Sequence, residues 1–261
     1  MKKFILIFII FTVSKSYSCT CARGNTVESF MEYEAVFKAK VISENEHYPN
    51  SKTPKIITLE ITEVFKGNPT KTLMIERGKC HTVAPKLNTE WIIFTSKNDK
   101  GIYFLEDCNA SFTLEPNKYT QESNQRFNYW SQNIKDKIEV LSLLSKTNDL
   151  NFQLPRIISK DNQNLISFLK SLPKEKFIND FGLYIIKFNT DRSVKEIVTL
   201  NSLGEEVDSV VEIYYKYRAD WQYRDVDKRE DDFKDGDSFS VILTKNQLFE
   251  NLWDKMKKQY K

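Results

Sequence analysis

The first half of the chain alternates hydrophobic and polar residues in short runs, and this pattern predicts β-strands. The clearest alternation covers residues 56–65, where a one-residue slip near Glu63 predicts a β-bulge. Further strands are expected at 35–42, 71–76, 90–95 and 101–105, the last two as a hairpin around 97–100. Five strands with one apolar face predict an all-β, OB-like barrel with flanking helices.

Two helices are expected beside these strands. A short one over 27–33 should have Thr26 as its N-cap, with Ser29 and Glu32 facing outward. A longer one is predicted within 118–147, where apolar residues recur at spacings of three and four. These residues are Phe127, Trp130, Ile134, Ile138, Leu141 and Leu144. We interpret this helix as the one that closes the barrel, with a partner-binding helix as the alternative.

The pattern of the second half predicts a separate α+β domain over residues 162–261, after a linker at 148–161. Its expected elements are a helix at 165–172, a hairpin of 182–189 and 193–200, a helix at 205–217, a strand at 237–244 and a final helix at 247–259. The domain therefore has a ββαβ order. Because all cysteines lie in the first half, we expect the barrel domain, 19–147, and the second domain to fold as separate units.

Residues 1–18 have the pattern of a signal peptide. Two lysines precede a run at 4–13 that is apolar except for one threonine, and the small residues Ser16 and Ser18 lie at −3 and −1 before the expected cut after Ser18. The run is too short to span about 30 Å of hydrocarbon. We expect an exported protein, periplasmic, outer-surface or extracellular, without a transmembrane segment in the mature chain. The alternatives are an uncleaved anchor and a lipid tether at Cys19.

Composition and charge narrow the classes of function. The 261 residues are 40% hydrophobic and 29% charged, enough for a buried core. Of the 39 basic residues, three lie in the signal peptide, which leaves 36 against 36 acidic ones, so nucleic-acid binding is not expected. The chain has no phosphate-binding, dinucleotide-binding or nucleophile-elbow motif, and its only histidines are His47 and His81. The acidic run 225–237 lacks the order of a calcium loop. We therefore predict no enzyme activity, no intrinsic metal and no cofactor.

The four cysteines, Cys19, Cys21, Cys80 and Cys108, predict two disulfides in an exported chain. A bridge within Cys19-Thr20-Cys21 would be strained, so each of these two cysteines is expected to reach a distant partner. The spacing leaves open which pairing forms. A four-cysteine zinc site is the alternative, although the sequence lacks paired C-x2-C knuckles.

A family resemblance rests on these cysteines and two strand segments. In order, they are Cys19-Thr20-Cys21, the segments AVFKAKV at 35–41 and ITEVFKG at 61–67, and the lone Cys80 and Cys108. The set resembles the N-terminal domain of the tissue inhibitors of metalloproteinases, within the wider netrin-like family, over roughly residues 19–115. The resemblance implies an OB-like barrel and the bridges Cys19–Cys80 and Cys21–Cys108.

The resemblance also implies a mechanism for one branch of the family. In inhibitory members the α-amine and carbonyl of the first cysteine chelate the protease zinc, and the next residue enters the specificity pocket. These positions are Cys19 and Thr20 here, supported by the loop with Lys79. Inhibitory members have six cysteines in this domain, against four here. We therefore expect a non-enzymatic adaptor or scaffold that binds another protein, with inhibition of a zinc endopeptidase as the alternative.

A second resemblance covers roughly residues 180–244. The chain has Gly182-x-Tyr184, then Ser202-Leu203-Gly204, Val207-Asp208, a predicted helix, Trp221 and a last strand. This series resembles the C-terminal domain of TonB-type energy-transducing proteins. No TonB-like membrane anchor and proline-rich spacer precede it, so the resemblance implies a protein-interaction module rather than energy transduction.

Overall fold

A computed structural model describes residues 25–45, 55–75, 85–106, 109–147, 157–159, 163–219, 221–223, 237–245 and 248. Several predictions fall outside these ranges. They are the signal peptide, all four cysteines, Thr20, Lys79, both histidines, nearly all of the acidic run and the final helix apart from Leu248. These predictions stay untested by the structure.

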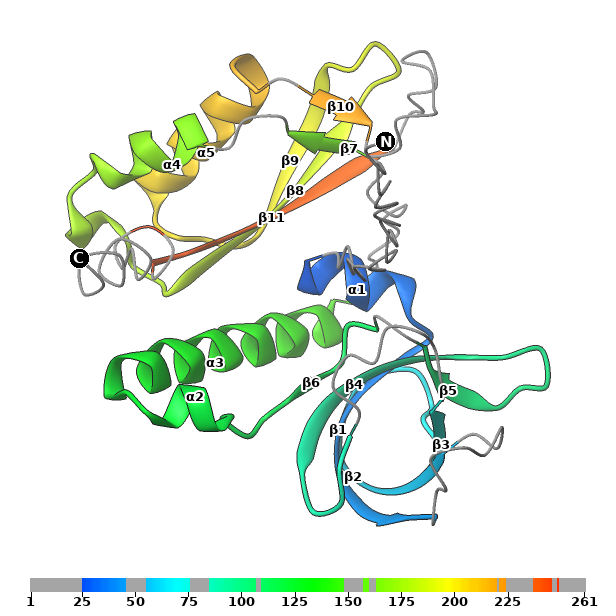
Figure 1. Cartoon of the computed structure of the whole chain (residues 1–261). Coiled ribbons are helices and arrows are strands. Elements are labelled where there is room, and N and C mark those ends of the chain that lie inside the picture. Colours follow the sequence, from blue (N-terminus) through cyan, green and yellow to red (C-terminus); the bar gives the residue numbers. More distant parts are fainter. Residues whose placement is uncertain are drawn as a thin grey trace, which may run out of the picture.

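The first half forms a closed five-stranded β-barrel, compatible with the expected OB-like barrel (Figure 1). Its strands are β1 (Ala35–Glu44), β2 (Lys55–Lys66), β3 (Thr72–Ile75), β4 (Glu90–Lys97) and β5 (Tyr103–Leu105). The sheet runs β1-β2-β3-β5-β4, and β4 pairs back onto β1 to close it. The β3–β5 pair is parallel and the other barrel pairs are antiparallel. A short strand not foreseen from the sequence, β6 (Phe112–Thr113), adds to β4.

The first residues of strand β1 are buried on both faces, and this explains its imperfect alternation. Phe37 and Ala39 point into the barrel core, whereas Val36 belongs to a second cluster outside the barrel. In the β1–β2 ladder, Lys38 pairs with Glu63 and Ala39 with Ile61. The intervening residue of β2 is left over, so the bulge predicted near Glu63 is confirmed.

Helices α1 (Thr26–Glu32), α2 (Lys118–Gln121) and α3 (Asn124–Lys146) flank the barrel. Two details of the α1 prediction are wrong. The N-cap is Asn25, not Thr26: its side chain accepts a hydrogen bond from Glu28 N at 2.9 Å, and its N–H donates to the Glu28 carboxylate at 3.3 Å. Ser29 is buried rather than outward-facing, because α1 packs against neighbours on two sides.

The second half contains a three-stranded antiparallel sheet in the order β11-β8-β9. The strands are β8 (Phe181–Phe188), β9 (Val194–Asn201) and β11 (Ser238–Thr244), and the helical segments are α4 (Gln163–Lys170), η1 (Lys174–Lys176) and α5 (Glu205–Tyr217). A separate pair joins β7 (Ile157–Ser159) to β10 (Trp221–Tyr223). Strand β7 lies within 148–161, the segment interpreted from the sequence as a linker.

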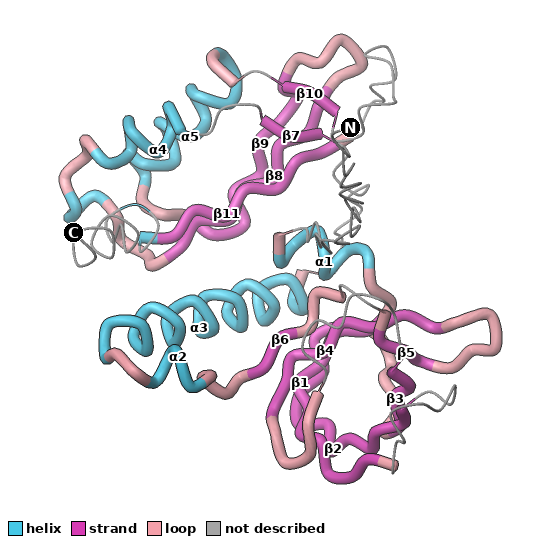
Figure 2. The backbone as a smooth tube through the Cα atoms, in the orientation of Figure 1, coloured by secondary structure: helices cyan, strands magenta, loops and turns pink. Residues whose placement is uncertain are grey.

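Strand β8, at the centre of the sheet, is buried on both faces, between helices of the two halves (Figure 2). Tyr184 and Ile186 of β8 belong to the cluster formed with α4 and α5. Leu183 and Ile185 belong to the cluster that also contains residues of α1, α3 and the outer face of β1 and β4. One hydrophobic core therefore crosses the segment that was expected to separate two domains. Within the described ranges, no helix is long and apolar enough to cross a bilayer.

Candidate functional site

The residues expected to carry function, Cys19, Thr20, Cys21, Lys79, Cys80 and Cys108, all lie outside the described residues. The structure therefore brings none of them together and gives no disulfide distance. In the described ranges, no group of three or more His, Cys, Asp or Glu side chains could hold a metal ion. The candidate site has to be found in the part of the chain that is described.

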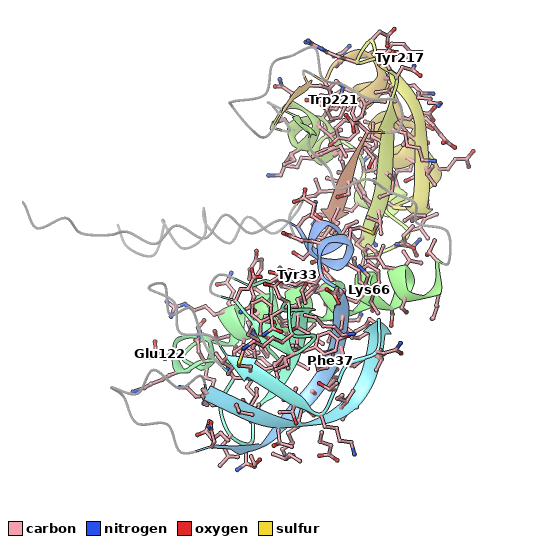
Figure 3. The ribbon with its side chains drawn as sticks, turned by 90° about the vertical axis from the view of Figure 1, so that its right-hand side faces the viewer. Tyr33, Phe37, Lys66, Glu122, Tyr217 and Trp221 are labelled. Carbon is pink, nitrogen blue, oxygen red and sulfur yellow. The ribbon has the colours of Figure 1, made fainter. Side chains whose placement is uncertain are left out.

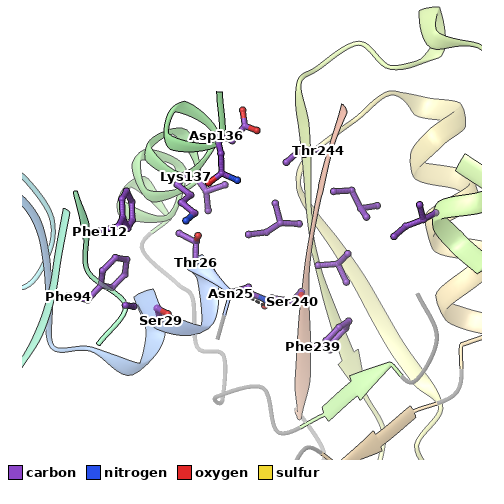
Figure 4. Close-up of a pocket in the computed structure, with 17 residues that line it drawn as sticks. Asn25, Thr26, Ser29, Phe94, Phe112, Asp136, Lys137, Phe239, Ser240 and Thr244 are labelled. Atoms are coloured by element: carbon purple, nitrogen blue, oxygen red, sulfur yellow. Dashed lines mark hydrogen bonds between the residues drawn. The ribbon is translucent and has the colours of Figure 1, made fainter. Parts of the chain in front are cut away.

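A cleft of about 570 Å³ lies between the barrel side of the molecule and strand β11 (Figure 4). This volume is within the range of ordinary ligand sites. One wall consists mainly of residues from α1, β4, β6 and α3, and the other of residues 239–244 of β11 with Ile166 of α4. Residues that line it include Ser29, Phe94, Phe112, Asp136, Val140 and Ser240.

Strand β11 contributes its outer edge to this cleft. Phe188 N donates to Asp237 O, and Lys245 N donates to Asp180 O, both at 2.9 Å. In an antiparallel ladder the bonding direction alternates, so odd-numbered residues of β11 bond to β8 and even-numbered ones point their N–H and C=O away. Ser240 and Ile242 are such even-numbered residues.

Asn25 connects this edge to the start of α1. Its side-chain amide donates to Ser240 O at 3.3 Å and to Ser240 Oγ at 3.0 Å. The same side chain caps α1 through Glu28 N. Asn25 therefore occupies one carbonyl of the β11 edge and sets the position of α1 at the end of the cleft.

Asp136 is the buried ionisable group of the cleft, with 6% of its surface exposed. Gln132 Nε2 donates to its Oδ1 at 2.7 Å. Burial raises the pKa of Asp136 from its ordinary value; Glu139 and Asp180 act in the same direction, while Gln132 and Lys135 oppose the shift. The cleft thus contains a carboxyl group that is costly to ionise.

The Val64-Phe65-Lys66-Gly67 segment, part of the first resemblance, fastens α1 to the barrel (Figure 3). The Lys66 ammonium donates to three carbonyls at the end of α1, those of Phe30, Met31 and Tyr33, at 2.7, 3.0 and 2.6 Å. Burial lowers the pKa of Lys66, and Glu34 opposes this shift. Gly67 has φ +71°, and a Cβ there would lie 2.3 Å from Glu34 O. These residues have a structural role that orients α1.

Several residues of the second resemblance contact one another around the Asp208 carboxylate. Tyr184 OH donates to the Asp208 carboxylate at 2.5 Å, Leu203 N donates at 3.0 Å, and Ser202 Oγ donates to the same carboxylate. A Cβ at Gly182 would lie 2.6 Å from the Tyr184 hydroxyl oxygen. Burial, followed by the hydrogen bond to Asp208, raises the pKa of Tyr184. These hydrogen bonds fix the start of α5 on the sheet.

No protein-family model matches the chain, and no curated protein sequence matches it. The cleft is therefore interpreted from its own geometry. Sequence reasoning missed it because its walls come from segments far apart in the chain. The Asn25-x-x-Glu28 capping box was the one local signal that marked its edge.

Proposed function

We propose that the protein is an exported, non-enzymatic protein-interaction module that binds an extended segment of a partner polypeptide. The segment would add as a strand to the outer edge of β11, inside the cleft. The observation that carries this proposal is that β11 pairs on only one side among the described strands, while residues along its length line the cleft.

Strand addition needs backbone groups that are available for pairing. Among the described residues, the outward N–H of Ser240 and the outward N–H and C=O of Ile242 have no hydrogen-bond partner. An extended peptide gains affinity from such main-chain bonds and specificity from pockets for alternate side chains. Phe112 supplies partly exposed apolar surface on the facing wall, whereas Phe94 and Val140 of the same lining are each only 1% exposed.

The finer family assignments belong to the same proposal. A netrin-like barrel is supported by the closed five-stranded arrangement and by the position of α1 on it. A TonB C-terminal-like module is supported by the chain order β8, β9, α5, β11. Both assignments imply contacts with other proteins rather than catalysis.

The test compares two substitutions at Ile242. Proline lacks the N–H that points into the cleft, and this N–H is not used by β8, so Ile242→Pro should block strand addition and leave the ladder intact. Ile242→Ala is the matched control, because it shortens the side chain and keeps the N–H. A library of random peptides of about seven residues, a typical strand length, is selected on each full-length protein.

We expect the wild-type protein and Ile242→Ala to enrich a common peptide motif, and Ile242→Pro to enrich none. Circular dichroism and thermal unfolding check that all three proteins are folded. Equal enrichment by Ile242→Pro, or no enrichment by the wild-type protein, would refute strand addition at β11.

The alternative, inhibition of a zinc endopeptidase, depends on a free α-amine at Cys19. An unprotonated amine can ligate zinc, so one alanine added before Cys19 should abolish inhibition by displacing that group. A panel of zinc endopeptidases is titrated with the native and the extended protein. Equal inhibition by both forms, or none at micromolar concentration, would reject the chelating mechanism.

A further inference from the structure

Asp136 lies on α3 and faces the Thr244 end of β11 across the cleft (Figure 4). The residue is 6% exposed, and Gln132 is its only hydrogen-bond donor among the described residues. A carboxylate with four lone-pair sites is incompletely satisfied by one amide. Asp136 therefore has acceptor capacity that the described residues leave unused.

The nearby cations interact with other groups. Lys135 Nζ lies 3.6 Å from Glu139 and 3.8 Å from Asp180, and Lys245 Nζ lies 3.8 Å from Asp180. Lys137 Nζ lies 4.7 Å from the centre of the Phe112 ring. No ion pair joins any described cation to Asp136 within 4.0 Å. A buried carboxylate without a paired cation is costly, and a cation brought by a ligand would offset that cost.

We propose that Asp136 selects a lysine or arginine in the segment that docks on β11. The cation of this side chain would pair with the Asp136 carboxylate at the Thr244 end of the cleft. The inference rests on the proposed function, because strand addition is what fixes the register of the docked segment.

The strand geometry restricts the preferred lysine or arginine to one position of the docked segment. Alternate residues of an added strand point to the same side, so one of them can face Asp136 only in a fixed register with Ile242. The neighbouring positions on that side face the apolar part of the lining, in which Phe112 is partly exposed. The expected motif is therefore a basic residue followed or preceded, two positions away, by an apolar one.

The charge state of the site adds a dependence on pH. Asp136 must be ionised to pair with a cation. Its pKa is raised by burial and by Glu139 and Asp180, with Lys135 opposing. Binding of a basic peptide should therefore weaken as the pH falls through this raised pKa, above the pH at which an exposed aspartate would lose its charge.

The test selects the same random peptide library on the full-length wild-type protein, Asp136→Asn and Glu139→Gln. Glu139→Gln removes the same charge from α3, three residues away, at a side chain that is 42% exposed and does not line the cleft. We expect the wild-type protein and Glu139→Gln to enrich lysine or arginine at one fixed position, and Asp136→Asn to lose that preference while still binding peptides.

One enriched peptide is then synthesised with its basic residue and with norleucine in its place. The replacement should weaken binding to the wild-type protein by about tenfold or more and to Asp136→Asn by less than about twofold. An equal loss on both proteins, or enrichment without a basic position, overturns the role of Asp136 and leaves strand addition standing. Failure of the wild-type protein to select any peptide, or equal selection by Ile242→Pro, overturns both.

Discussion

At the scale of single residues, the carboxyl group of Asp136 couples folding to pH. Its pKa is raised in the folded chain from an ordinary value of 3.8, chiefly by burial. The folded state therefore holds a proton over a pH range in which the unfolded state has lost it. The free energy of unfolding falls as pH rises from the ordinary pKa through the raised one. The contribution of Asp136 to stability is therefore least favourable at neutral pH.

The first prediction is that Asp136→Asn stabilises the protein at neutral pH. Asparagine keeps the acceptor for Gln132 and removes the buried charge, so the free energy of unfolding should rise by about 1 kcal/mol. Below the ordinary pKa of aspartate the difference should vanish, because both side chains are then neutral. Urea denaturation across this pH range measures both values. A loss of stability at neutral pH would contradict the assignment of Asp136 as a penalised carboxylate.

Alanine substitutions at two glycines with positive φ distinguish the cost of backbone strain from the cost of a steric clash. Gly67 has φ +71° and Gly101 has φ +75°, but a Cβ at Gly101 would meet nothing within 4 Å. Gly101→Ala should therefore cost about 1 kcal/mol, the penalty of the left-handed conformation alone. Gly67→Ala should cost at least about 2 kcal/mol more, because its Cβ would strike the Glu34 carbonyl. Equal losses in thermal unfolding would show that the contact relaxes freely.

At the scale of secondary-structure elements, the sequence predicted the helices and strands whose hydrophobic residues follow a single periodicity. The helix predicted at 205–217 coincides with α5, and the predicted strands correspond to β1 to β5, β8, β9 and β11. The short strands β6 and β7 were not predicted, because each forms only by pairing with a distant segment. The partner is Trp91-Ile92 for β6 and Trp221–Tyr223 for β7. Ser29 was wrongly predicted to face outward, because a polar residue is a guide to exposure only on a helix face that packs against nothing.

The candidate site was beyond sequence reasoning for a related reason. Whether Ile242 points its N–H toward β8 or toward the cleft depends on the ladder register, which pairs it with Leu183. Asp136 meets residues of α1 and β11 in the cleft, and these elements are far from α3 in the sequence. By contrast, the motif residues Lys66 and Gly67 were visible in the sequence, but their role in holding α1 required the three-dimensional contacts.

The attachment of α1 to the barrel gives the prediction at this scale. Lys66→Met keeps the aliphatic stem and leaves three helix-end carbonyls without their donor, so the free energy of unfolding should fall by about 1–3 kcal/mol. Lys38→Met is the matched control, because the Lys38 ammonium makes a partly exposed ion pair with Glu90 at 3.5 Å. Its loss should change stability by less than about 0.5 kcal/mol. Similar losses in both variants, measured by chemical denaturation, would argue against a special role for Lys66.

At the scale of the whole molecule, the shared core decides how the two halves behave. The cluster that contains Val27, Val140 and Leu141 on the barrel side also contains Phe181, Leu183 and Ile185 of β8. A large apolar interface opposes relative motion of the parts it joins. The cleft depends on this arrangement, because its two walls belong to different halves. Whether fragments 19–147 and 162–261 each fold alone stays a prediction, and each fragment would expose its side of this cluster.

The last prediction tests the coupling directly, with two leucines that are both 0% exposed. Leu183 packs toward α1 and α3, whereas Leu169 of α4 packs on the opposite face of the sheet. Each change to alanine should lower the free energy of unfolding by about 2–5 kcal/mol. Native-state hydrogen exchange should speed up in α1 and α3 for Leu183→Ala, and much less for Leu169→Ala, because only the first substitution opens the interface. If exchange in α1 and α3 is unchanged by Leu183→Ala, the halves are independent neighbours, and a cleft built from both walls would have no fixed geometry with which to hold a peptide in register.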